Sequence, residues 1–326
     1  MPTGLGRILD RIAPPPVLVD IGASGACPEI WRQVASWSTY VGFDPDRRDL
    51  HTDANSPFKR YLVIPAAVSP ESGTATLYET KFAHCSSLMA PDTPALSDYL
   101  FADSFTVERT RQLTTVTLAE ALQSAGLGEK IDWLKSDTQG MDLRIIQSLP
   151  PALQDGLLAV DVEPGLINAY RGEDHFVTAH QYLMAAGFWP SVCKVCGDRR
   201  MRPETLADVA SRHTGLTPQL VNRVLRPAPG WIEGRYLRRL DWLAEHKATV
   251  RDYLLLWCFA MVDLQYGFAL DIAVALRKLG EAETGAELEQ LAIAALTGSP
   301  VAWRPLHLLS RALRKGHLLL TGQSGR

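Results

Sequence analysis

Short apolar runs alternate with helix-like patterns along residues 13–190 of this chain. The apolar runs at 17–19 and 131–134 have the length of buried strands, whereas 141–149 and 174–186 repeat apolar residues at helical spacing. Strands that alternate with helices predict a parallel sheet with helices on both faces. Further strands are expected at 40–43, 61–64, 74–78, 156–162 and 188–195.

The pattern changes near residue 202, and beyond it we expect helices only. We therefore expect two units, a sheet domain over residues 1–200 and a helical C-terminal extension over 201–326. The basic, amphipathic segment 304–320 is most simply a docked terminal helix, although it could also contact a membrane surface or a partner. The helices are expected at 204–223, 237–246, 250–260, 268–279 and 286–295.

A turn of small residues follows the first strand, with Asp20 at its mouth and Gly22, Ala23 and Gly25 within it. Glycines at the carboxyl end of a strand allow a ligand to approach the backbone closely. The turn lacks the G-x-G-x-x-G pattern of dinucleotide sites, and Asp20 would repel a phosphate by roughly 1–4 kcal/mol. A phosphate-free, positively charged ligand such as S-adenosylmethionine fits better, although small-residue turns also close ordinary strands.

Acidic residues stand at the ends of three further predicted strands. Asp44 ends the second strand, where an acid can accept hydrogen bonds from the ribose hydroxyls of any adenosine cofactor. Asp137 and Glu163 end two neighbouring strands and should face one crevice. Each could be a general base, a partner of a substrate hydroxyl or a metal ligand, or could simply cap a loop.

The irregular segment 81–105 is expected to be a lid or binding loop, and it contains His84, a further candidate base. Two acids are too few to infer a metal, so no metal site is assigned. Cys193 and Cys196 form a single C-x-x-C without a second pair, which we interpret as structural rather than as a zinc or redox motif.

Composition describes an ordinary globular chain. The 326 residues are 46% hydrophobic and 21% charged, and the formal net charge of −3 gives no basic field for nucleic acid. The five cysteines form an odd set without a disulfide framework, which favours a reducing compartment. The amino terminus shows no signal peptide, and acids interrupt the most apolar segment, so a cytoplasmic location is expected.

Together the motifs resemble the FkbM-type methyltransferase family in order and spacing over about residues 15–190. The most specific match is DWLKSDTQG at 132–140, which is similar to the family's LK-x-D-x-x-G signature. The other matching segments are VDIGA at 19–23 with Gly25, GFDPD at 42–46, AAVS at 66–69 with Gly73, SSL at 86–88, TVTL at 115–118, VE at 162–163 and YRG at 170–172.

The resemblance implies a class I methyltransferase fold, a Rossmann-like seven-stranded mixed sheet with helices on both faces, to which the all-helical C-terminal region would be added. It also implies S-adenosylmethionine as cofactor, with contacts from Asp20, Gly22, Ala23, Gly25, Asp44 and Ala67.

The expected reaction is O-methylation of a hydroxyl on a sugar or secondary metabolite, so the partner is a small-molecule or glycan acceptor. Asp137 is the first candidate base, followed by Glu163 and His84. One alternative is an inactive methyltransferase-like scaffold whose helical region binds a partner or membrane surface. Another is an NAD-dependent oxidoreductase or epimerase, which would need the missing glycine pattern.

Overall fold

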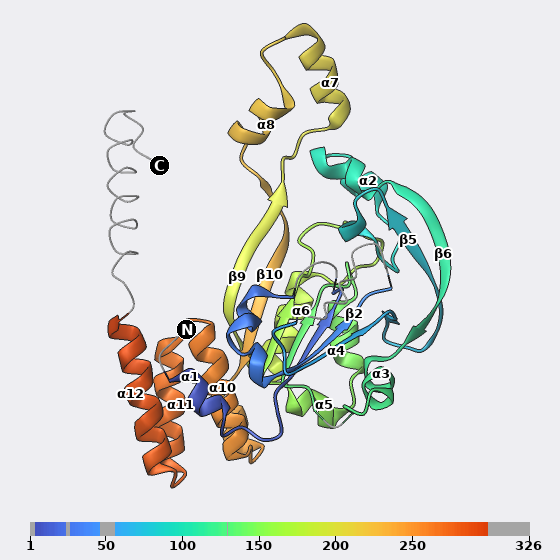
Figure 1. Ribbon diagram of the computed structural model, residues 1–326. Coiled ribbons are helices and arrows are strands. Elements are labelled where there is room, and N and C mark those ends of the chain that lie inside the picture. The colour runs from blue at the N-terminus through green and yellow to red at the C-terminus, as the bar shows by residue number, and fades with distance from the viewer. Residues whose placement is uncertain (1–3, 24–26, 46–55, 129, 299–326) are drawn as a thin grey trace, which may run out of the picture.

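A computed structural model describes residues 4–23, 27–45, 56–128 and 130–298 and has a seven-stranded sheet at its centre (Figure 1). The strand order is β3-β2-β1-β7-β8-β10-β9. The strands are β1 (Val17–Ile21), β2 (Thr39–Phe43), β3 (Arg60–Ile64), β7 (Trp133–Ser136), β8 (Ala159–Val162), β9 (Phe188–Asp198) and β10 (Ala228–Arg238).

The strands from β3 to β8 run parallel, and β10 lies antiparallel between β8 and β9. The chain builds the sheet outward from β1 in one direction and from β7 in the other. The carboxyl ends of β1 and β7 therefore flank a topological switch point, where open α/β sheets bind ligands. The predicted mixed sheet of seven strands is confirmed.

Helices cover both faces of the sheet, as expected. One face packs against α3 (Leu118–Ser124), α4 (Asp142–Ser148), α5 (Pro151–Gly156) and α6 (Phe176–Ala185). The other face packs against α1 (Leu5–Leu9), α10 (Val250–Val262) and α11 (Tyr266–Lys278). The remaining helices are α2 (Thr93–Leu96), α7 (Pro203–Arg212), α8 (Pro218–Val224), α9 (Leu240–Glu245) and α12 (Ala282–Gly298). None of the helices in the described ranges has both the length and the apolar character needed to span a bilayer.

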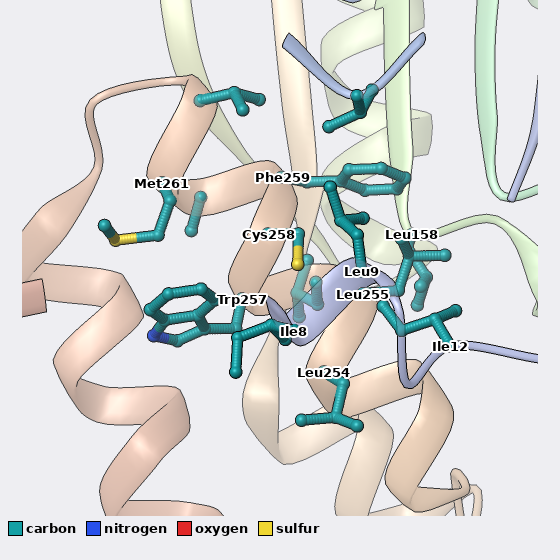
Figure 2. Close-up of a cluster of buried hydrophobic side chains, with 14 of the residues drawn as sticks. Ile8, Leu9, Ile12, Leu158, Leu254, Leu255, Trp257, Cys258, Phe259 and Met261 are labelled. Carbon is teal, nitrogen blue, oxygen red and sulfur yellow. The ribbon is translucent and has the colours of Figure 1, made fainter. Parts of the chain in front are cut away.

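Helix α10 belongs to the central core although it lies far beyond residue 200. Its side chains are buried from Asp252 to Val262, and Figure 2 shows Phe259 and its neighbours packed near α1 and Leu158. The ring of Phe259 contacts that of Trp133 on β7 edge to face, with 4.7 Å between centroids. Helix α10 therefore packs as part of the sheet's core, of which it supplies one wall.

The expectation of helices only beyond residue 202 is wrong for β10. Its buried positions alternate along the strand, but two of them are Gly230 and Gly234, so the sequence shows no apolar alternation there. Pro227 and Pro229 also suggested a chain break. A sheet strand therefore lies on the far side of the expected boundary at residue 200.

The expected helix at 204–223 also needs correction, because it is broken into α7 and α8. The segment after the first turn forms two 3-10 helices, Glu29–Gln33 and Ala35–Trp37. A small second sheet of order β4-β6-β5 contains the unpredicted strand β6 (Val107–Val116), which is largely exposed and polar. Its other strands are β4 (Ala67–Val68) and β5 (Gly73–Thr80).

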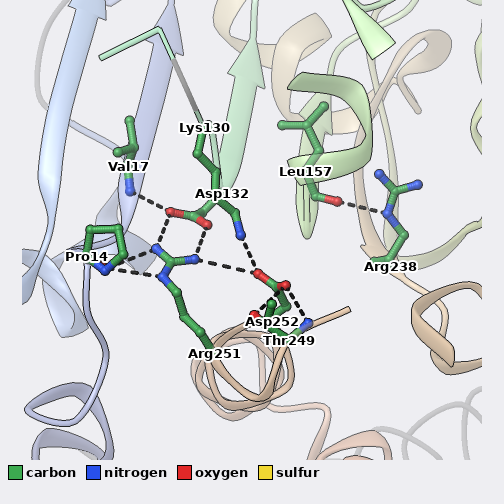
Figure 3. A network of polar contacts seen from close by, with 9 residues as sticks. All are labelled: Pro14, Val17, Lys130, Asp132, Leu157, Arg238, Thr249, Arg251 and Asp252. Carbon is green, nitrogen blue, oxygen red and sulfur yellow. Dashed lines mark hydrogen bonds and ion pairs between the residues drawn. The ribbon is translucent and has the colours of Figure 1, made fainter. Parts of the chain in front are cut away.

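A buried ion pair fastens α10 to the amino ends of the central strands (Figure 3). Asp132 is fully buried and accepts hydrogen bonds from Arg251 Nη1 and Nη2 at 2.8 and 3.0 Å and from the Val17 amide at 2.9 Å. Arg251 also donates to the Pro14 carbonyl. Burial opposes the charge on Arg251, but the hydrogen bonds and charge of Asp132 outweigh it and raise the pKa of the guanidinium.

A chain that ends at residue 200 is expected not to fold, because it lacks both β10 and α10. Strand β9 would lose its partner, and Trp133 and Leu158 would lose the helix that covers them. We expect insoluble protein, or soluble protein without a cooperative unfolding transition by circular dichroism. A chain that ends at Gly298 keeps every described element and should unfold cooperatively. A stable, cooperative 1–200 fragment would contradict this account of the core.

Replacing Arg251 with alanine should lower the free energy of unfolding by about 3–5 kcal/mol, because Asp132 would be left as a buried charge without its cation. The measurement is denaturant unfolding at neutral pH. Arg277→Ala is the matched control, since the Arg277–Glu289 pair is largely exposed and should cost about 1 kcal/mol or less. Equal losses in the two variants would argue against a structural role for the buried pair.

Candidate functional site

The turn after β1 lies directly against the end of β7. Gly22 has φ 81°, a conformation that L side chains rarely adopt, and a Cβ there would lie 2.2 Å from the carbonyl oxygen of Asp137. The Gly22 and Ala23 amides donate to the Phe43 carbonyl at the end of β2. This position requires glycine, and it brings the ends of three strands together.

A row of alternating charges crosses the sheet next to this turn. Asp20, Lys135, Asp161 and Arg235 are consecutive register partners on β1, β7, β8 and β10. Lys135 Nζ lies 3.1 Å from Asp20 Oδ1, and Arg235 Nε lies 2.8 Å from Asp161 Oδ1. Arg235 Nη1 also lies 2.7 Å from Asp263 Oδ1 at the end of α10. We call these four strand residues the charged row.

Lys135 is the cation nearest to the candidate acids. Its Nζ lies 3.7 Å from Asp137 Oδ2, and the charge of Glu163 also acts on it. Burial opposes the ammonium charge, but Asp20, Asp137 and Glu163 outweigh it and raise the pKa of Lys135. Asp20 also accepts a hydrogen bond from the Tyr40 hydroxyl at 3.1 Å. The Asp20 carboxylate is therefore already paired, which revises the expectation that its charge is available to a cationic ligand.

A cleft of about 740 Å³ opens at the carboxyl ends of β1 and β2, and Asp20 is not among its described lining residues. Its lining includes Gly22, Asp44 and Ala67, from the ends of β1 and β2 and the start of β4. His84 and Asp137 also line it. Among the described residues that line it, none is lysine or arginine. We call this the first cleft.

The turn that follows β7 holds Asp137 in place. Gln139 has φ 58°, a left-handed conformation that is uncommon for residues other than glycine. Its backbone carbonyl accepts a hydrogen bond from Ser87 Oγ at 2.8 Å, and its side-chain Nε2 donates to Asp137 Oδ1 at 2.6 Å. Tyr170 donates from its hydroxyl to Gln139 Oε1 at 2.9 Å. The Asp137 carboxylate is thus oriented through Gln139.

A second cleft, of about 1270 Å³, adjoins the first. It shares His84, Asp137 and Gln139 with the first cleft, and Glu163 also lines it. Burial and the nearby charge of Asp137 raise the pKa of Glu163 to about 8, so this group is mostly protonated at neutral pH. Within the described residues its side chain accepts no hydrogen bond from the protein. The carboxylate of Asp137 is therefore held by the protein, whereas the carboxyl group of Glu163 is available to a ligand.

The segment expected to be a lid forms part of the wall of the second cleft. It contains the 3-10 helices Ala83–Cys85 and Leu100–Phe105 on either side of α2, so it is less irregular than expected. Phe105 packs edge to face against Tyr170 with 5.6 Å between centroids. His84 lies in the first of these short helices, with its ring 5.0 Å from that of Phe82.

The structure brings together most, but not all, of the residues predicted for the site. Asp137 and His84 lie at the junction of the clefts, Glu163 lies in the second cleft, and Gly22, Asp44 and Ala67 line the first. Ala23 is buried, Asp20 belongs to the charged row and is paired with Lys135, and Gly25 lies outside the described residues. The roles of these residues stay predictions.

Sequence reasoning missed Lys135, Gln139, Tyr170 and Trp231. Lys135 could have been suspected, because a lysine inside a buried strand needs carboxylate partners. Gln139 and Tyr170 act through contacts between distant segments, which the sequence does not display. Trp231 was missed because β10 was missed.

The expected structural interpretation of the C-x-x-C pair agrees with its geometry. Cys193 and Cys196 both lie on β9, three positions apart, so their side chains leave opposite faces of the strand. Across the described ranges, no group of three or more histidine, cysteine or acidic residues is arranged to hold a metal ion.

Comparison with known proteins identifies the family. The family model described as Methyltransferase FkbM domain matches residues 20–191, more than half of the chain, from Asp20 on β1 into β9. Neither the curated proteins nor the solved structures include a match to this chain. The fold and the family match agree with the resemblance seen in the motifs, and this chain belongs to the FkbM methyltransferase domain family.

Proposed function

We propose that this protein is an S-adenosylmethionine-dependent O-methyltransferase that acts on a hydroxyl of a sugar or secondary metabolite. The observation that carries the proposal is the junction of two clefts at Asp137. One cleft would hold the cofactor and the other the acceptor, so that methyl donor and hydroxyl meet beside an oriented carboxylate.

The chemistry of the first cleft suits this cofactor. Gly22 lines this cleft and leaves the backbone of the turn after β1 without a side chain. The cleft is lined by the acids Asp44 and Asp137 and, in the described lining, by no lysine or arginine, so it is unsuited to a pyrophosphate. Asp44 is a candidate for the ribose hydroxyls, and the acidic lining favours a ligand with positive charge.

When bound, S-adenosylmethionine would supply an electrophilic methyl group attached to a sulfonium. The protein must then position an acceptor oxygen in line with that group and remove its proton. Asp137 is suited to the second task, because Gln139 holds one of its carboxylate oxygens and Lys135 Nζ lies 3.7 Å from the other. The hydroxyl proton would pass to Asp137 as the oxygen bonds to the methyl carbon.

Lys135 and Glu163 set the charge around Asp137. With Glu163 protonated, Asp137 shares the Lys135 ammonium with Asp20, and burial raises the pKa of Asp20 although Lys135 opposes that shift. Protonated Glu163 can exchange hydrogen bonds with a neighbouring hydroxyl of the acceptor. When ionised, it becomes a second proton acceptor.

Asp137→Asn should retain binding of S-adenosylmethionine, with only the weakening that follows from one lost acid in the first cleft. It should lose methyl transfer by about 10²–10⁴-fold, because asparagine cannot accept the hydroxyl proton. Binding is measured by calorimetric titration. Turnover is measured by mass gain of one methyl on an acceptor found by screening hydroxylated sugars and polyketide-like compounds.

The matched control is Asp271→Asn, on the exposed surface of α11, which should change neither quantity. Full activity in Asp137→Asn would remove this residue from the mechanism. A wild-type protein that binds neither S-adenosylmethionine nor its homocysteine product would instead favour the non-catalytic scaffold.

The pH dependence should identify Glu163. Its pKa is raised from 4.5 to about 8, so kcat/KM for the acceptor should rise as pH passes through about 8 and ionised Glu163 becomes available. Glu163→Gln should lack this rise. An unchanged rise in Glu163→Gln would assign the ionisation to another group.

The same ionisation makes a prediction for stability. Because the folded state raises this pKa, the protonated form stabilises the fold, and that contribution is lost as pH rises from about 4.5 to about 8. The free energy of unfolding of Glu163→Gln minus that of the wild type should therefore be larger at pH 9 than at pH 4. Denaturant unfolding at the two pH values measures this independently of catalysis.

A further inference from the structure

The second cleft has an unusual lining. Aromatic rings and carboxyl groups line the same space, and among the described residues that line it none is lysine or arginine. The aromatic residues are Phe82, Phe101, Phe105, Tyr170 and Trp231, and the acidic residues are Asp137, Glu163, Glu173 and Asp198. A ligand in this cleft would meet flat apolar faces and hydrogen-bonding oxygens, but no lysine or arginine among the described lining residues.

Trp231 is placed in the cleft by β10. Past the main sheet, β10 and β9 continue as a two-stranded ribbon toward α7 and α8 (Figure 1). The Gly230 carbonyl accepts hydrogen bonds from the Leu166 and Ile167 amides at 2.8 and 3.2 Å, and Trp231 bridges to Gly165. The loop that follows Glu163 is therefore attached to the strand that carries Trp231.

The ring of Trp231 is also supported from the lid side. It stacks on Phe101 with 6.5 Å between centroids and an angle of 21° between planes. The Leu100 amide donates to the Arg199 carbonyl at 3.1 Å, which ties this part of the lid to the end of β9. Trp231 is thus a supported aromatic surface in the cleft that also contains Asp137 and Glu163.

We propose that the second cleft binds an uncharged hydroxylated ring whose apolar face stacks on Trp231, and that it rejects acceptors that carry a phosphate or carboxylate. This inference rests on the proposed function for the reaction, but the binding it describes does not require methyl transfer. Trp231 lies outside the matched residues 20–191 and is therefore a specificity-determining residue contributed by this chain's own ribbon.

The physical basis is complementarity of shape and charge. Pyranose and cyclohexane rings present carbon-bound hydrogens on their faces and hydroxyls at their edges, so they can stack on an aromatic surface while their hydroxyls bond to carboxyl groups. Lys135 and Arg199 lie next to the cleft but are paired with its acids Asp137 and Asp198, so a phosphate or carboxylate on the same ring would have to compete with these carboxylates for them. Charge thus discriminates between acceptors of similar shape.

The test measures binding of matched probes to the full-length protein by saturation-transfer NMR and competition. The neutral probes are trans-cyclohexane-1,2-diol and the methyl glycosides of glucose, galactose, mannose and rhamnose. The anionic probes are methyl glucuronoside, methyl galacturonoside and glucose 6-phosphate. We expect at least one neutral ring to bind, and to bind about tenfold or more tightly than its anionic counterpart.

Variants assign the effect to the aromatic surface. Trp231→Ala should weaken binding of the neutral ring by about tenfold, and Trp231→Phe, which keeps a flat ring, should retain most of it. Val224→Ala is the control, because Val224 lies at the end of α8, next to the ribbon in the chain, is 66% exposed and does not line the cleft. Circular dichroism confirms that each variant is folded.

Each outcome bears on the proposal. It is overturned if anionic probes bind as tightly as neutral ones, if Trp231→Ala binds like the wild type, or if no neutral ring binds to a protein that binds S-adenosylmethionine. The last result would leave the methyltransferase proposal intact. Ring binding in a protein that does not bind S-adenosylmethionine would support the cleft inference and refute the proposed function.

Discussion

The pairing of Lys135 with the carboxylates around it is the constraint on which the site depends. An ammonium inside a sheet is tolerated only if opposite charges compensate for its lost hydration. Asp20 provides the closest charge, and Asp137 is drawn toward the same ammonium. The pairing fixes the ends of β1 and β7 relative to each other. Asp137 and Glu163 are then the acids beside Lys135 that line the second cleft.

The charged row extends this constraint across the sheet to α10. Asp161 and Arg235 continue the alternation, and Asp263 at the end of α10 completes it. At the opposite edge of the sheet, Arg251 on the same helix binds Asp132. Helix α10 is therefore attached at both ends by ion pairs and along its length by apolar contacts, which explains why a domain matched over residues 20–191 depends on residues beyond it.

The sequence could predict part of the site because parallel strands place their carboxyl ends at one edge of a sheet. Asp44, Asp137 and Glu163 were found by that rule alone, since each follows a recognisable apolar run. The partner of Asp20 could not be found in the same way, because Lys135 lies 115 residues further along the chain. The acid was recognised as significant, but its charge was assigned to a ligand instead of to a buried lysine.

Strand β10 was missed for a different reason. Its buried face includes Gly230 and Gly234, which allow close approach of neighbouring backbone but contribute no apolar side chain to a periodic pattern. Because β10 was not predicted, Trp231 was not recognised as a residue that lines the second cleft.

The two clefts differ in how strongly the fold determines them. The first is built where β1, β2 and β7 end, and hydrogen bonding of the sheet fixes those positions. The second is lined by the segment 81–105 and by the ribbon of β9 and β10. In that ribbon the residues of β10 that precede Gly234 do not pair with β8. Substitutions on the ribbon can reshape the second cleft without moving Asp137, because Gln139 and Lys135 hold that carboxylate from the β7 side. Under the proposed function, a fixed carboxylate beside a separately supported wall would allow acceptor specificity to change while the chemistry stays the same.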